Sequence, residues 1–221
     1  MPRTLAIGDI HGCVIALRTL AEYVPFDTDD MVITLGDYVD RGPDSAGVLD
    51  WLIEREANGR LVAIRGNHDE MMLGARQFGG GSWLACGGDM TLESYKHDGQ
   101  FGTVDDVPTA HWEFLESKCR LYYETESHLF THGTPVSDVA IADQPAFSLL
   151  WNFWDSPAPH CSGKVMVCGH SSQESGRLLS IGHAICIDTG AGSGGWLTRL
   201  DVESGEYWQA DDDGRTRNGV L

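Results

Sequence analysis

Short apolar runs alternate with helix-like patterns over the first third of the chain. Leu5–Ile7, Met31–Leu35 and Leu61–Ile64 are nearly continuous apolar segments, which is typical of strands that are buried on both faces. Between them, residues 14–24 and 48–53 place apolar side chains at helical spacing. The order strand, helix, strand, helix, strand predicts an α/β fold with right-handed crossovers.

The rest of the chain begins with helices and then becomes rich in strands. Glycines at 79–81 and 87–88 interrupt a helical region that reaches about Tyr95, and a further amphipathic helix is expected over 108–118. The strands that we expect after it are 120–123, 128–131, 165–168, 178–181, 184–187, 196–202 and, beyond a hairpin turn at Ser204-Gly205, 206–209.

The length and the polar end of the chain predict the domain organisation. A chain of 221 residues is the usual size of one domain, and no interdomain linker stands out. We expect one domain over residues 1–210. Residues 211–221 are polar and begin with three aspartates, so we expect them to form a flexible, solvated tail.

The charge balance excludes some classes of partner. Asp and Glu number 33 against 15 Lys and Arg, a formal net charge of −18. Such a surface repels nucleic acid backbones and anionic lipid, so we expect neither a nucleic acid nor a membrane partner. An anionic substrate remains compatible with this charge, because bound divalent cations can reverse the local field.

The cysteines and the start of the chain indicate the compartment. Six cysteines are scattered without any CxxC pair, which is unlike a disulfide framework or a zinc ribbon and suits a reducing environment. No apolar run approaches the roughly 20 residues of a membrane span. The first residues also lack the pattern of a secretory signal. We therefore expect a cytoplasmic protein, with a monomer as the working oligomeric state.

Polar side chains suited to metal binding or catalysis follow five of the expected strands. Carboxyl ends of strands are where sites form in open α/β sheets, so these residues are expected to converge. They are Asp9 and His11, then Asp37 and Asp40, then Asn67, His68 and Asp69, then His132, and finally His170.

The types of side chain predict the class of metal. Carboxylates, an amide oxygen and imidazoles, without thiolates, suit divalent manganese, iron or zinc. Asp9 and His11 are two positions apart, so in an extended segment they point to the same side and can bind one ion. If two ions lie about 3.5–4 Å apart, one carboxylate must bridge them. Asn67 and His68 are adjacent and should point in different directions, one to metal and the other to substrate.

Three blocks of these residues resemble a known family. Gly8–Gly12 (GDIHG), Gly36–Gly42 (GDYVDRG) and Arg65–Asp69 (RGNHD) are similar to the signature blocks of the phosphoprotein phosphatases, which are calcineurin-like metallophosphoesterases. The resemblance extends over residues 4 to about 202 and is strongest to the small bacterial and bacteriophage lambda type of serine/threonine phosphatase. It implies an α/β sandwich of two mixed β-sheets flanked by helices. The later blocks are Thr131–Gly133, Trp151-Asn152, Gly169-His170 and Ile187–Ala191.

The resemblance also implies roles for single residues. Asp9 and His11 would hold a first ion, Asp37 would bridge both ions, and Asn67, His132 and His170 would complete the second. Arg41 would bind the phosphoryl oxygens, and His68, oriented by Asp40, would stand near the leaving group. The implied cofactor is a pair of transition-metal ions, manganese first, with iron or zinc as alternatives. The implied reaction is phosphomonoester hydrolysis by a metal-bridging hydroxide.

Three functions are compatible with these blocks. The first is a phosphatase for phosphoserine and phosphothreonine in proteins, with tolerance for phosphotyrosine. The second is a dinucleoside polyphosphate hydrolase such as a diadenosine tetraphosphate hydrolase, although enzymes of that kind are usually longer than this chain. The third is a non-catalytic protein that binds phosphorylated partners, which the intact ligand set disfavours. We favour the protein phosphatase.

One position departs from the family pattern. After Trp151-Asn152 the resembling enzymes carry a second phosphate-binding arginine, and this chain has Phe153. Phe153 is either an apolar wall for an aromatic leaving group or a packed loop anchor, and we favour the anchor. Arg177 is a weaker candidate to replace the arginine.

The histidines outside the blocks are interpreted as non-catalytic; they are His97, His111, His128, His160 and His183.

Overall fold

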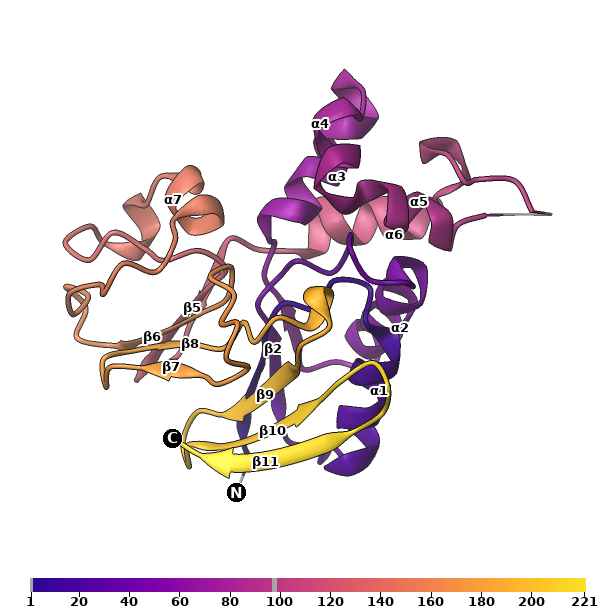
Figure 1. The fold of residues 1–221 in the computed structure, drawn as a ribbon. Helices are drawn as coiled ribbons and strands as arrows, with labels where there is room; N and C mark the ends of the chain where they lie inside the picture. The colour runs from indigo at the N-terminus through magenta and orange to yellow at the C-terminus, as the bar shows by residue number, and fades with distance from the viewer. Residues whose placement is uncertain (1, 97–98) are drawn as a thin grey trace.

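Two mixed β-sheets pack face to face, and helices cover the outer side of each sheet (Figure 1). The computed structural model describes residues 2–96 and 99–221. The first sheet has six strands in the order β11-β10-β9-β1-β2-β3, and the second has five in the order β4-β5-β6-β8-β7. This arrangement confirms the fold class expected from the sequence.

The strands and helices have the following bounds. The strands are β1 Thr4–Ile7, β2 Met31–Thr34, β3 Leu61–Ala63, β4 Tyr122–Glu124, β5 His128–Thr131, β6 Val165–Cys168, β7 Leu179–Ser180, β8 Ala184–Cys186, β9 Leu197–Asp201, β10 Glu206–Ala210 and β11 Thr216–Val220. The helices are α1 Val14–Tyr23, α2 Ser45–Ala57, α3 Asn67–Phe78, α4 Gly81–Trp83, α5 Asp89–Ser94, α6 Thr109–Glu113 and α7 Ala146–Trp151. Shorter 3₁₀ or π turns lie at Leu84–Gly88, Val104–Asp106, Phe114–Lys118, Ile141–Asp143 and Ala191–Ser193.

Both faces of the central strands are covered, which explains their continuous apolar sequences. In β1, Ala6 belongs to the cluster between the two sheets, while Ile7 belongs to the cluster under α1 and α2. A strand with solvent on one face would alternate apolar and polar residues instead. The second sheet buries Leu129 and Met166 on its outer side, against Leu149 of α7.

Parallel pairing brings the functional loops to one edge. Strands β1, β2 and β3 are parallel and in register at Ile7, Thr34 and Ala63. Strands β5, β6 and β8 are likewise parallel. Because parallel strands of one sheet end at the same edge, the loops that follow β1, β2 and β3 emerge side by side, and so do those that follow β5, β6 and β8.

The end of the chain differs from the expectation of a polar tail. Thr216–Val220 forms β11, which pairs antiparallel with β10 along its whole length. Its polar residues suit an edge strand that covers the sheet. Arg217, for example, lies 4.1 Å over the ring of Trp196 and donates from Nε to Gln209 Oε1 at 2.6 Å. The expected tail over 211–221 is therefore corrected to a turn and an edge strand.

In the described part of the chain, no helix combines the length and the apolar character needed to cross a bilayer.

Candidate metal centre

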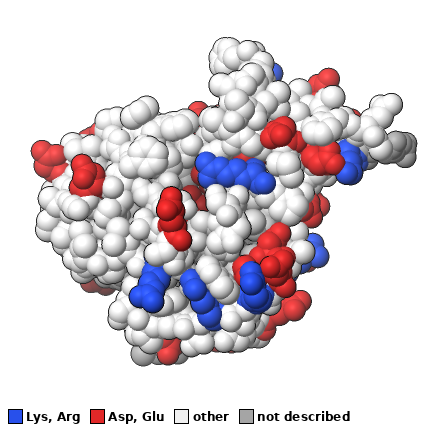
Figure 2. Space-filling model, in the orientation of Figure 1, with Lys and Arg blue, Asp and Glu red and all other residues white. Residues whose placement is uncertain are grey.

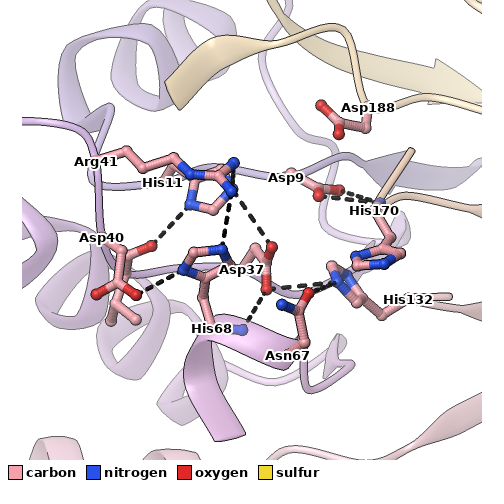
Figure 3. A network of polar contacts seen from close by, with 12 residues as sticks. Asp9, His11, Asp37, Asp40, Arg41, Asn67, His68, His132, His170 and Asp188 are labelled. Atoms are coloured by element: carbon pink, nitrogen blue, oxygen red, sulfur yellow. Dashed lines mark hydrogen bonds and ion pairs between the residues drawn. The ribbon is translucent and has the colours of Figure 1, made fainter. Parts of the chain in front are cut away.

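The loops after β1, β2, β3, β5 and β6 meet between the two sheets (Figure 3). All six side chains expected to bind metal gather there. Five are buried, and His170 is half-buried. They are Asp9, His11, Asp37, Asn67, His132 and His170. Residues that the sequence spreads over most of the chain therefore share one small volume.

Asp37 lies at the middle of this group. Its Oδ2 is 3.3 Å from His11 Nε2, and its Oδ1 is 3.4 Å from His132 Nε2. Two sets of donor atoms, each within 4.8 Å of one another, share this carboxylate: His11, Asp37 and His68, and Asp37, His132 and His170. One carboxylate with an oxygen facing each set has the arrangement that a bridging ligand needs.

Backbone carbonyls orient the imidazoles. His11 Nδ1 contacts the carbonyl of Val39 at 2.8 Å, and His132 Nδ1 contacts the carbonyl of Leu35 at 2.9 Å. His170 uses its other nitrogen, Nε2, toward the carbonyl of Trp151 at 3.2 Å. A carbonyl only accepts, so each of these ring nitrogens carries the proton, and the opposite nitrogen keeps its lone pair.

The electrostatic environment favours the metal-binding forms. Burial lowers the pKa of His11 and of His170 to about 4, and it also lowers the pKa of His132, so these imidazoles are neutral. Burial alone would raise the pKa of Asp37, but attraction to the three neighbouring histidines outweighs it and lowers that pKa. Asp37 is therefore an anion among neutral nitrogen donors.

Two more buried carboxylates, those of Asp9 and Asp188, lie close to Asp37. Burial and then repulsion by Asp188 and Asp37 raise the pKa of Asp9 well above its usual range. Burial likewise raises the pKa of Asp188 to about 6. Buried carboxylates that repel one another favour a cation between them. Together with the N and O donors, this charge fits two divalent transition-metal ions.

Asp9 is held differently from the other candidate ligands. It belongs to neither donor set, and its two carboxylate oxygens accept the backbone N–H of His170 at 3.2 and 3.0 Å. The segment that joins it to His11 is not extended as expected, because His11 lies in a turn with φ 47°. Gly169 permits the close approach, since a Cβ there would lie 2.0 Å from Asp9 Oδ1.

Asn67 and His68 point in different directions, as expected for neighbours in a helix start. Asn67 Oδ1 lies 2.8 Å from His132 Nε2. His68 points the other way, with Nδ1 2.6 Å from Asp40 Oδ2 and Nε2 3.0 Å from Arg41 Nη2. Arg41 therefore donates to His68 Nε2, while His68 Nδ1–H donates to Asp40. Arg41 Nη1 also contacts His11 Nε2 at 3.0 Å.

Two further residues support this pair and were missed by sequence reasoning. The indole N–H of Trp83 and the hydroxyl of Thr91 both donate to the carboxylate of Asp40, Thr91 at 2.8 Å. Both come from the glycine-punctuated region around α4 and α5, where they resemble ordinary core residues. Asp188 was also given no role, although it lies near Asp9 and Arg41 (Figure 3).

The backbone at the centre is strained. Among the described non-glycine residues, positive φ angles occur at His11, Asp37, Asp40, Arg41 and His170, and otherwise at Arg60 and Ser156. Each such residue costs on the order of 1–3 kcal/mol unless the surrounding structure compensates. Concentration of this strain in the strand-end loops is typical of a functional site.

A hollow of about 360 Å³ opens beside these residues. Its polar lining consists of Asp37, Arg41, Asn67, His68 and His170, and its remaining lining consists of Met71, Cys86, Trp151 and Phe153. We call it the central hollow. Arg177 is exposed and does not line it.

Phe153 is not a packed loop anchor. Its side chain is 69% exposed, and its ring stacks on the ring of His170 with centroids 4.5 Å apart. The interpretation that we favoured from the sequence is therefore wrong.

Among the histidines outside the motifs, His97 lies outside the described residues, and His111 bonds to Tyr95 Oη at 2.7 Å and Asp50 Oδ1 at 3.0 Å, away from the centre.

The sequence matches a family model described as calcineurin-like phosphoesterase over residues 2–191. Among curated relatives, serine/threonine-protein phosphatase 1 of Salmonella typhimurium is 32% identical over 219 residues, covering 89% of this chain and 90% of the relative. The symmetrical bis(5'-nucleosyl)-tetraphosphatase of Legionella pneumophila is 43% identical over 89 residues, which cover 40% of this chain but 30% of the relative.

Solved structures show the same fold. A chain proposed to be a diadenosine tetraphosphatase superposes with a TM-score of 0.68 at 20% identity, covering 100% of this chain and 96% of its own. A cold-active protein-tyrosine phosphatase of a Shewanella species superposes with a TM-score of 0.61 at 18% identity, covering 99% and 80%. At these identities the likeness extends to the fold alone.

Proposed function

The chain belongs to the calcineurin-like phosphoesterases, and on that premise we propose that it is a metal-dependent phosphatase acting on phosphoserine and phosphothreonine in proteins. The observation that carries the proposal is the convergence of Asp37, Arg41 and His68 on the central hollow. A carboxylate, a guanidinium and an imidazole therefore line one space, which supports the proposal.

In this proposal six residues bind two metal ions, and Asp37 is a ligand of both. Asp9, His11 and Asp37 hold one ion, and Asp37, Asn67, His132 and His170 hold the other. When bound, such ions supply an activated water as the nucleophile and neutralise charge on the phosphoryl group. We propose manganese as the native metal, with iron or zinc as alternatives.

Arg41 and His68 act on the substrate in this proposal. The planar guanidinium of Arg41 can donate two parallel hydrogen bonds to phosphoryl oxygens. These hydrogen bonds strengthen as negative charge develops on the oxygens. Its present contacts with the ring nitrogens of His11 and His68, both at 3.0 Å, place it at the mouth of the centre. Asp40 holds His68 through Nδ1, so that Nε2 can carry a proton to the departing oxygen.

The extent of the similarity favours a protein phosphatase. The match to the Salmonella phosphatase spans 90% of that relative, whereas the match to the Legionella tetraphosphatase spans 30% of it. The central hollow agrees with this preference, because Arg41 is the one cationic side chain among its described lining residues. A nucleoside diphosphate leaving group carries several negative charges and would meet Met71, Trp151 and Phe153 instead.

A dinucleoside polyphosphate hydrolase is the alternative, supported by the 43% identity to the Legionella tetraphosphatase over 89 residues. Turnover of a phosphothreonine peptide and of diadenosine tetraphosphate by the same manganese-loaded preparation would separate the two. We expect a higher kcat/KM for the peptide. A preference for the dinucleotide would replace the proposal, and absence of turnover on both, with metal bound, would leave a phosphate-binding protein.

A further inference from the structure

The central hollow is lined by both charged and apolar side chains. Asp37, Arg41 and His68 are polar or charged, and Met71, Trp151 and Phe153 are apolar or aromatic. A phosphoryl group matches the charged part of this lining. The apolar part is suited to an uncharged group bonded to the phosphorus through oxygen. The lining therefore concerns the leaving group as well as the phosphate.

Phe153 presents one open ring face beside the candidate centre. The ring is stacked on His170, with centroids 4.5 Å apart and 26° between the planes, yet 69% of the residue is exposed. It also borders two neighbouring hollows, of about 390 and 560 Å³.

Arg41 is the one Lys or Arg side chain among the described residues that line the hollows around Phe153. Helix α7, which ends at Trp151 two residues earlier, carries no charged side chain. Figure 2 shows few charged groups on the surface over this helix. Arg177 is exposed and lines neither the central hollow nor the two beside it, so no second arginine contributes here.

We propose that Phe153, with Trp151 and Met71, forms a wall that contacts the leaving group and extends the activity on phosphoserine and phosphothreonine to aryl phosphates, such as a phosphotyrosine side chain. This inference rests on the proposed phosphatase function. Phe153 stacks on the proposed metal ligand His170 and lines the central hollow, so its ring borders the space that a substrate would enter. In phosphotyrosine that group is a flat ring, which can stack on Phe153. In a nucleotide the base is separated from the phosphate by a ribose.

Substitution of Phe153 tests the wall. We expect Phe153→Leu and Phe153→Ala to lower kcat/KM for a phosphotyrosine peptide about three- to tenfold more than for the phosphothreonine peptide of the same sequence. The ratio of kcat/KM for the two peptides is compared between wild type and variant. The intrinsic reactivities of the two leaving groups are the same in every variant, so they cancel in this comparison. Phe153→Arg should lower KM for the phosphothreonine peptide and shift the ratio of the two kcat/KM values further toward that peptide.

Phe147→Leu is the matched control. Phe147 is 67% exposed and stacks on Trp151, with centroids 6.4 Å apart, but it does not line the central hollow. The ratio of the two peptides should stay at the wild-type value in this variant. An equal change in the Phe147 and Phe153 variants, or an unchanged ratio in all Phe153 variants, would overturn the proposal.

A binding measurement separates this inference from the proposed function. Calorimetry with phenylphosphonate and methylphosphonate on the manganese-loaded protein needs no turnover. We expect the wild type to bind the phenyl compound more tightly by about three- to tenfold, and Phe153→Leu to lose that difference. If neither peptide is hydrolysed, the proposed phosphatase function is wrong, but the comparison of the two phosphonates still tests whether Phe153 contacts the group bonded to phosphorus. Equal binding of both compounds by the wild type would refute it.

Discussion

The indole N–H of Trp83 lies between the two carboxylate oxygens of Asp40, at 2.9 Å from Oδ1 and 3.0 Å from Oδ2. Trp83 is 43 positions further along the chain and almost fully buried. Asp40 in turn accepts from His68 Nδ1 at 2.6 Å. The orientation of His68 therefore depends on a residue that contacts neither the hollow nor any proposed metal ligand.

Trp83→Phe should lower kcat while leaving KM close to the wild-type value. The phenyl ring preserves most of the packing but cannot donate to Asp40, and one hydrogen bond to a charged group contributes about 1.5–3 kcal/mol. We expect kcat to fall about ten- to a hundredfold for a phosphothreonine peptide. Trp112→Phe is the control, because Trp112 is also buried but lies on α6. An equal loss in both variants would indicate general destabilisation.

His68→Asn should lower kcat by about 10²–10⁴ for alkyl phosphates, which is the usual contribution of a general acid. The loss should be smaller for aryl phosphates, whose leaving groups need less protonation. Metal content should remain at the wild-type level. Steady-state kinetics on both substrate types give the comparison, with His111→Asn as the control for loss of a buried histidine. Equal losses on the two substrates would mean that His68 positions phosphate instead.

Asp37→Asn should reduce metal content and turnover together, because its two oxygens face both donor sets. Elemental analysis of the purified protein, paired with a phosphatase assay, gives both quantities. A chelator should abolish wild-type turnover, and added manganese should restore it. Asp50→Asn, at an exposed carboxylate, should change neither quantity. Full activity in metal-free wild-type protein would contradict a metal-dependent mechanism.

Arg199→Met should leave the free energy of unfolding unchanged or raise it by about 1–4 kcal/mol. Arg199 is fully buried, and its guanidinium nitrogens have no hydrogen-bond partner among the described residues. The rings of Phe26 and Trp208 lie 4.9 and 5.2 Å from it, and burial lowers its pKa to about 10. Methionine fills similar volume without a charge to desolvate. Urea unfolding measures the change, and a loss of several kcal/mol would show that the guanidinium stabilises the fold.

Asp30→Asn should destabilise the protein near neutral pH by about 1.5–3 kcal/mol, the range for hydrogen bonds to a charged group. Burial raises the pKa of Asp30, but hydrogen bonds from the Arg3 side chain and from the N–H groups of Asp27 and Arg3 outweigh it, so the pKa is lowered. A lowered pKa stabilises the fold above the unfolded value of about 3.9 and loses this effect as the pH falls through the folded value. Urea unfolding at several pH values should show the gap between wild type and variant closing in acid. A constant gap would contradict the linkage.

Local periodicity determined much of the fold. The continuous apolar runs at β1, β2 and β3 reflect burial on both faces, which a sequence shows directly because no polar position interrupts them. Parallel strands of one sheet end at one edge, so the strand-end positions of Asp9 and Asp37 were enough to predict that they meet. His132 follows β5 of the other sheet, so its place beside them also depends on how the two sheets pack. β11 escaped this reasoning, because an edge strand can be polar and its pairing with β10 is a long-range contact.

Tertiary packing decided the details of the site. The nitrogen that each histidine turns to the centre depends on a carbonyl supplied by another loop, as with His132 and Leu35, which are 97 positions apart. The hydrogen bond from Trp83 to Asp40 likewise joins two segments that are far apart in the chain. The exposure of one face of the Phe153 ring depends on the position of His170, which covers the other face. The types and order of the side chains were present in the sequence by itself. Their orientation and exposure were not, because these follow from contacts between segments whose spacing in the chain carries no periodic signal.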